Sequence, residues 1–172
     1  MDIAALLQLQ FNNAHGLLEA VMSDLTPEAA RYVPPGGIVA TIGGQYLHIL
    51  TIEDLIMQTI LKGVAPLYTT TFLGKIGSDE VPQFAVWGEW GRTADVDLAK
   101  AREYGKAVYA ETDRYLSRMT PDALESPFDL SLMGLGMSTR AGVISAALNN
   151  IHIHTGEISA IKGLQGLKGY PI

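Results

Sequence analysis

The sequence predicts an all-α protein, an up-down bundle of four helices with a long connection between the second helix and the third. Three observations lead to this fold class. Four long segments carry apolar residues at helical spacing, short segments that begin with Thr-Pro join the helices within each pair, and one long irregular region separates the two pairs. We expect the whole chain, residues 1–172, to form a single domain.

Composition and charge exclude several classes of function. The chain has no cysteine, so disulfides, thiolate zinc sites and a cysteine nucleophile are ruled out. Its net charge is −6 and its 12 lysine and arginine residues are scattered, so we expect no nucleic acid partner. Polar residues such as Gln8 and Asn12 in the first segment fit neither a signal peptide nor a membrane span. We therefore expect a cytoplasmic protein with no membrane partner.

The first pair of helices is predicted on either side of a short joint. Residues 3–24 form the first helix, because apolar residues recur there at three- and four-residue steps. The joint TPEAARYVPPGG places Thr26 as an N-cap and Pro27 at the first helical position, and further prolines end it within two turns. The second helix is predicted over residues 41–61, with His48 at the centre of its apolar stripe.

Residues 63–93 have no sustained period and are predicted to be an irregular connection, long enough to have a function of its own. Its two tryptophans, Trp87 and Trp90, either wall a pocket or pack as aromatic anchors. A third helix is predicted over residues 95–119, and the segment TPDALESPFDL that follows repeats the first joint. The segment DLSLMGLGMSTR is ambiguous and is compatible with an extended conformation.

The last helix is predicted to begin at a cap at Ser138 or Thr139 and to end at about residue 164. Its segment NNIHIHTGEIS contains two histidines one residue apart. At about 100° per residue, His154 falls inside the apolar arc of this helix and His152 lies about 160° away from it. Asn150 and Glu157 flank His154 on the same side. The arc itself is defined by Ile144, Ala147, Leu148, Ile151 and Ile158.

These polar residues allow two interpretations. A single histidine on an apolar helix face is more often a buried core residue than a metal ligand, but His48 and His154 both occupy such positions. The core of a helix bundle is also where metal and cofactor sites are usually built. Both interpretations therefore remain open. His15 lies at the edge of the apolar stripe of the first helix, and we expect it to be a boundary residue and not a ligand.

Several segments together resemble the DinB superfamily, four-helix proteins that include thiol-dependent transferases and metal-dependent hydrolase-like members. They are QYLHILTIEDLIM on the second helix, HTGEISAIKGLQG on the last, the joint LTPEAARYVPPG and the closing GLKGYP. The resemblance implies a divalent ion, zinc or nickel, held by one histidine on the second helix and two a turn apart on the last. His48 matches the first position and His154 the third, but Asn150 occupies the middle position and departs from the pattern.

The departure at Asn150 weakens the implied metal site. An amide oxygen is a neutral and weaker ligand than imidazole, so a set of His48, Asn150 and His154 is expected to hold zinc or nickel weakly or not at all. His152 replaces the missing ligand only if the helix is locally distorted. Glu157 either orients His154 or contacts a metal-bound water as a catalytic residue, or else it pairs with a basic side chain.

Two classes of function remain open. The first is a metal-dependent transferase or hydrolase that acts on a small molecule, with a low-molecular-weight thiol as one candidate. The second is a small-molecule-binding or stress-response bundle without catalytic activity that has lost the metal. In both, the pocket is expected between the second and fourth helices, with Trp87 or Trp90 near its mouth. Members of the superfamily commonly pair, and the apolar composition agrees with this, so we expect a homodimer.

Overall fold

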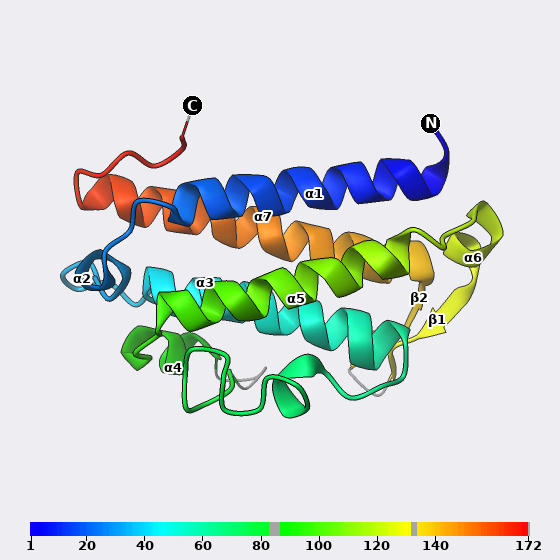
Figure 1. Cartoon of the computed structure of the whole chain (residues 1–172), viewed down its shortest axis with the longest axis horizontal. Coiled ribbons are helices and arrows are strands. Elements are labelled where there is room, and N and C mark those ends of the chain that lie inside the picture. The colour runs from blue at the N-terminus through cyan, green and yellow to red at the C-terminus, as the bar shows by residue number, and fades with distance from the viewer. Residues whose placement is uncertain (83–86, 132–133, 172) are drawn as a thin grey trace.

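The computed structural model describes residues 1–82, 87–131 and 134–171. Within these residues the protein is mostly helical, and four long helical segments pack around a common hydrophobic core (Figure 1). The α-helices among them are α1 (Ile3–Met22), α3 (Ile42–Asp54), α5 (Leu98–Leu116) and α7 (Arg140–Leu164). A π-helix, η1 (Leu55–Leu61), continues α3 to the residue where the second helix was predicted to end.

Side-chain caps explain where the long helices begin. Asp2, Thr41, Asp97 and Thr139 precede α1, α3, α5 and α7, and each side chain accepts a hydrogen bond from a backbone N–H of the first turn. Such caps satisfy amide groups that have no partner within the helix. Of the two caps proposed for the last helix, Thr139 is the one used.

The two Thr-Pro joints form short helices, as their sequences predict. These helices are α2 (Pro27–Ala30) and α6 (Pro121–Glu125), and each has a threonine cap and a proline in its first turn. The ambiguous segment that follows α6 forms a small hairpin, in which β1 (Pro127–Asp129) pairs antiparallel with β2 (Met137–Thr139). The extended interpretation of residues 129–140 is therefore correct for Asp129 and for Met137–Thr139.

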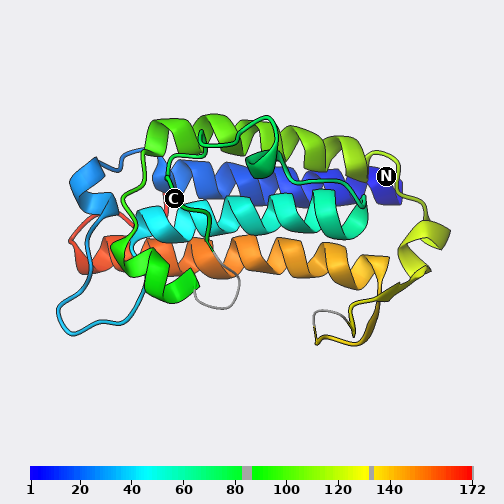
Figure 2. The same cartoon turned by 90° about the horizontal axis from the view of Figure 1, so that it is seen from below.

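Helices α3 and α5 run in the same direction, so the up-down order predicted from the sequence is wrong for this pair, because a long connection and not a short turn joins them. Near the start of both helices, a Cβ added at Gly43 would lie 3.2 Å from the Cβ of Val96. Near their ends, Lys62 Nζ lies 2.8 Å from Glu111 Oε2. The long connection returns the chain to the end of the molecule where α3 begins, as Figures 1 and 2 show.

This connection is more structured than its sequence predicts. It contains a 3-10 helix, η2 (Leu67–Thr69), and an α-helix, α4 (Trp87–Thr93); residues 83–86 lie outside the described residues. Helix α4 packs on the start of α3, where the backbone N–H and the hydroxyl of Thr41 both donate to the carbonyl oxygen of Gly91, each at 2.9 Å. This contact fixes Trp87 next to α3.

The core that holds the helices together contains several polar side chains. His48, Glu53 and Asp54 are all nearly or completely buried on α3, whose residues are almost all buried. Buried polar groups of this kind usually have hydrogen-bond partners, so those without one suggest a functional role. None of the helices in the described part of the chain has the length and apolar character needed to cross a membrane.

Candidate functional site

The three residues expected to bind a metal lie together between α3 and α7. Asn150 Nδ2 is 3.5 Å from His48 Nε2, and the ring centroids of His48 and His154 are 4.8 Å apart with nearly perpendicular planes. One residue comes from α3 and two from α7, which pack closely against each other. The site therefore forms where the sequence predicts a pocket, between the second and fourth long helices.

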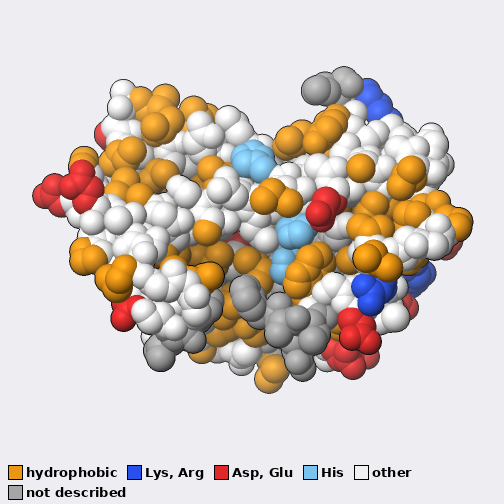
Figure 3. Space-filling model, turned by 180° about the vertical axis from the view of Figure 1, so that it is seen from behind, with side chains coloured by type: hydrophobic (Ala, Val, Ile, Leu, Met, Phe, Trp, Pro, Cys, Tyr) orange, Lys and Arg blue, Asp and Glu red, His pale blue; other side chains and the backbone are white. Residues whose placement is uncertain are grey.

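The site is accessible from one face of the molecule. Figure 3 shows histidine side chains at the centre of this face, with hydrophobic side chains around them. His154 is only partly buried, whereas His48 is 4% exposed. A small molecule arriving from solvent would thus meet His154 before His48.

Trp87 forms one wall of the site. Its ring stacks on the imidazole of His48, with centroids 3.9 Å apart and planes 16° from parallel, and it meets the ring of His154 edge-on at 5.1 Å. Trp90, on the same short helix, instead packs against the hydrophobic core. Trp87 is therefore the tryptophan that lies at the candidate site, and Trp90 is the packing anchor.

Burial keeps the imidazole of His48 neutral. Loss of solvent, together with the proximity of a second imidazole, that of His154, lowers the pKa of His48 to about 3. At neutral pH the ring thus carries one proton and one free lone pair, the form that binds metals. Its Nδ1 atom and the Oδ1 atom of Asn150 are buried and have no hydrogen-bond partner among the described residues.

Glu157 acts on His154 directly. Its Oε2 atom lies 2.6 Å from Nδ1 of His154, one turn earlier on α7. A carboxylate at this distance holds the proton of the ring on Nδ1 and leaves the lone pair of Nε2 free. Of the alternatives considered for Glu157, its contact supports the orientation of His154 and not an ion pair with a basic side chain.

The side chains present fit a divalent ion that is held weakly. Two imidazole nitrogens are available, but no group of three His, Cys, Asp or Glu side chains among the described residues forms a metal site. A third donor has to come from Asn150. Rotation of its amide by 180° exchanges Oδ1 and Nδ2 without a change of shape and turns the oxygen toward His48. The resulting set of two nitrogens and one neutral oxygen is poorer than three imidazoles.

The other two histidines lie elsewhere. His152 is exposed on α7, as its position outside the apolar arc predicts. His15 is 6% exposed, and its Nε2 atom lies 3.0 Å from both carboxylate oxygens of Glu53. The prediction that His15 is a boundary residue is therefore wrong: it is buried because Glu53, 38 residues further along the chain, supplies a charged partner.

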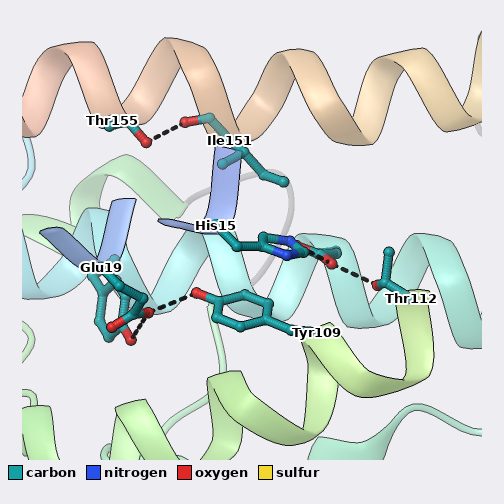
Figure 4. A network of polar contacts seen from close by, with 8 residues as sticks. His15, Glu19, Tyr109, Thr112, Ile151 and Thr155 are labelled. Atoms are coloured by element: carbon teal, nitrogen blue, oxygen red, sulfur yellow. Dashed lines mark hydrogen bonds and ion pairs between the residues drawn. The ribbon is translucent and has the colours of Figure 1, made fainter. Parts of the chain in front are cut away.

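His15 and Glu53 belong to a separate polar network between α1, α3 and α5 (Figure 4). Thr112 donates a hydrogen bond of 2.5 Å to Glu53, and Tyr109 stacks on His15 with ring centroids 3.8 Å apart. The hydroxyl of Tyr109 in turn donates to Glu19 at 2.8 Å. These polar groups satisfy one another inside the core, which supports a structural role.

An apolar groove begins at Asn150 and lies between the second and fourth long helices, although our sequence analysis did not identify its lining. It has a volume of about 370 Å³. One side is formed by η1 and the end of α3, and the other side by the first half of α7. Leu130, Leu135 and Met137 close it from the hairpin side. The four-residue repeat of Ile52, Ile56 and Ile60 is the only sequence signal for it, and that signal is also typical of a buried core stripe.

Comparison with known proteins gives a family and a similar fold. The family model described as the DinB superfamily matches residues 10–158. Among solved structures, the chain is similar to a conserved protein from Enterococcus faecalis, with a TM-score of 0.80 and 20% identity, over 95% of this chain and 97% of that one. Similarity at this level of identity concerns the fold alone. A search of curated proteins found no match.

Proposed function

The chain belongs to the DinB superfamily, and from this premise we propose that it is a metal-dependent enzyme that acts on a small molecule, as a thiol-dependent transferase or a hydrolase. The observation that carries the proposal is the convergence of His48, Asn150 and His154 between α3 and α7, next to an apolar groove that Asn150 also lines. A site between facing helices of a bundle is the usual place for metals and small ligands in such folds.

In this proposal each residue has one role. His48 and His154 each offer a neutral imidazole nitrogen, and Asn150 offers its amide oxygen. A zinc or nickel ion bound there supplies a Lewis acid that lowers the pKa of a bound water or thiol. Glu157 orients His154 through the 2.6 Å contact with Nδ1. Trp87 covers the face of His48 and excludes water from that side.

A second function is favoured by one specific observation. Asn150 stands where the superfamily pattern has a histidine, and an amide is a weak ligand for zinc and nickel. We therefore keep as the alternative a small-molecule-binding or stress-response bundle without catalytic activity that has lost its metal. The two candidates differ in a measurable property, the affinity of the site for a divalent ion.

The substitution Asn150→His tests the proposed metal site. It places two imidazoles four residues apart on one face of α7, next to His48, and we expect the affinity for zinc or nickel to rise about tenfold or more. The measurement is calorimetric titration of the untagged protein after chelation, together with elemental analysis of the protein as purified. We expect the unmodified protein to contain less than one ion per chain.

Asn149→His is the matched control, because residue 149 is exposed on the same helix and one position out of register. It adds an imidazole to α7 without directing it at His48, so its metal affinity should equal that of the unmodified protein. An equal gain in both variants, or no gain in either, would show that Asn150 does not point to where His48 and His154 meet. Complete absence of binding at micromolar metal would leave the alternative function.

A further inference from the structure

We infer that the groove beyond Asn150 binds a straight, uncharged alkyl chain whose polar head group, a hydrogen-bond donor such as a hydroxyl or a thiol, lies at Asn150. This inference deepens the proposed function and rests on it, because it takes from it that the site acts on a small molecule. It names the chemical class of that molecule as a neutral amphiphile, and three properties of the groove carry the inference.

The first property is shape. One wall presents Ile52, Ile56 and Ile60, and the other presents Gly142, Ala146 and Asn150, in both cases at steps of four residues. Residues 142–150 of α7 span about 12 Å at about 1.5 Å per residue. A volume of about 370 Å³ divided by this length gives a cross-section of about 30 Å². The groove is thus long and narrow, and it suits one extended chain better than a bulky ring system.

The second property is the chemistry of the lining. The side chains that line the groove are mostly aliphatic, and none of the described residues among them is charged. Leu135 and Met137 at its rim are 64% and 66% exposed, although they are large apolar side chains. Apolar residues gathered at one opening are typical of a ligand site, because a ligand removes their surface from water. The part of the ligand inside the groove is therefore apolar.

The third property is the polar end of the groove. The Oδ1 atom of Asn150 is buried and has no hydrogen-bond partner among the described residues. In the metal-free protein, where Nδ2 and not Oδ1 faces His48, this carbonyl oxygen can accept a hydrogen bond and favours a ligand with a donor at the corresponding end of its chain. The groove thus has two polar side chains in its apolar lining, Ser138 on the hairpin and Asn150 at the end near His48. The hydroxyl of Ser138 already donates to the carbonyl oxygen of Thr139, so the unpartnered oxygen of Asn150 sets the orientation of the ligand.

Binding of straight-chain primary alcohols from hexanol to decanol tests the channel. The titration is done calorimetrically on the full chain after chelation, so that no metal contributes. We expect the affinity to increase roughly fourfold for each added methylene until the groove is full, and then to level off. An affinity that does not depend on chain length would overturn the inference.

Substitution at Ala146 locates the binding site. Ala146 lines the groove and is itself exposed, so Ala146→Trp blocks the channel without filling the core, and we expect at least a tenfold loss of octanol affinity. Ala160→Trp, at an exposed position further along α7, should bind octanol as the unmodified protein does. Equal affinities in the two variants would place the alcohol elsewhere. If Ala146→Trp does not fold, Ile56→Ala is the second test. This substitution widens the groove, so the variant should bind a branched-chain alcohol.

The head group is tested with two isomers, octanol and heptyl methyl ether, of which only octanol donates a hydrogen bond. We expect the unmodified protein to bind octanol several-fold more tightly, and Asn150→Leu to abolish the preference. A preference that survives in Asn150→Leu would assign the head group to another residue and refute the orientation. If the alcohol affinity depends on chain length but Asn150→His gains no metal affinity, the metal enzyme is rejected and the groove is retained. If Asn150→His gains metal affinity but the alcohol affinity does not depend on chain length, the groove alone is rejected.

Discussion

At the scale of single residues, Asp54 shows how strongly the core alters the chemistry of a polar side chain. It is completely buried at the point where α3 passes into η1. Its Oδ2 atom accepts hydrogen bonds from the hydroxyl of Tyr104 at 2.8 Å and from the backbone N–H of Tyr68 at 3.1 Å. Burial nevertheless outweighs these contacts and raises the pKa of the Asp54 carboxyl. The proton on this group is therefore linked to stability.

The substitution Asp54→Asn should change how stability depends on pH. Because its pKa is raised, folded Asp54 keeps a proton at pH values where the unfolded chain has lost it. The folded state binds more protons in that window, so stability is lost as the pH rises above 3.8, the ordinary pKa of an aspartate. We expect Asp54→Asn to remove this loss of stability. A single group changes the free energy of unfolding by up to about 1.4 kcal/mol per pH unit.

Urea unfolding of both proteins at a series of pH values from acid to neutral measures this difference. Asp79→Asn is the control, because residue 79 is exposed in the connection between η1 and α5 and its substitution should leave the pH dependence as it is. Identical pH dependence in Asp54→Asn and the unmodified protein would mean that Asp54 ionises in the folded state as readily as in the unfolded chain.

Helical periodicity predicts some residues of the site well and others not at all. It separates His154 from His152 and places Asn150 and Glu157 beside His154, because all four positions belong to one continuous helix. The burial of His15 depends on Glu53, on another helix, and no local pattern reveals such a partner. The stacking of Trp87 on His48 likewise joins residues 39 positions apart along the chain, which only the packing of α4 brings together.

At the scale of elements, the sequence predicts the long helices and their joints, because caps, prolines and apolar stripes are local signals. The up-down order that it predicts gives α5 the wrong direction relative to α3, because this direction depends on the path of the long connection. The helix α4 that anchors this path packs on α3 through two glycines. A Cβ added at Gly44 would lie 2.5 Å from the carbonyl oxygen of Gly91, which is too close for any real contact. The position of Trp87 thus depends on Gly44.

The substitution Gly44→Ala should push α4 away from α3 and separate Trp87 from His48. We expect a loss of about 1–3 kcal/mol in the free energy of unfolding, the usual cost of overpacking, and a shift in tryptophan fluorescence. Gly16→Ala is the control, because a Cβ at this exposed helical position meets nothing within 4 Å. It should stabilise the protein by about 0.5–1 kcal/mol. Equal stability of the two variants would show that α4 moves aside without cost.

At the scale of the whole molecule, α1 and α7 pack against each other and share an unusual lack of charge (Figure 1). Residues 3–18 and 141–156 contain no Asp, Glu, Lys or Arg. Large apolar side chains on these segments nevertheless face solvent, among them Leu9 at 42% and Ile153 at 59% exposed. An uncharged surface with exposed apolar side chains is typical of an interface between proteins. We propose that a second copy of the chain covers it.

This proposal makes the protein a homodimer, which light scattering coupled to size-exclusion chromatography measures directly. We expect a dimer at micromolar concentration, and a monomer for Leu9→Glu or Ile153→Glu, because each substitution buries an unpaired charge if the copies associate. Leu73→Glu is the control: Leu73 is 68% exposed in the long connection, away from α1 and α7, so this variant should remain a dimer. A monomeric unmodified protein would refute the assembly, and a dimer that persists in both interface variants would move the interface to another face.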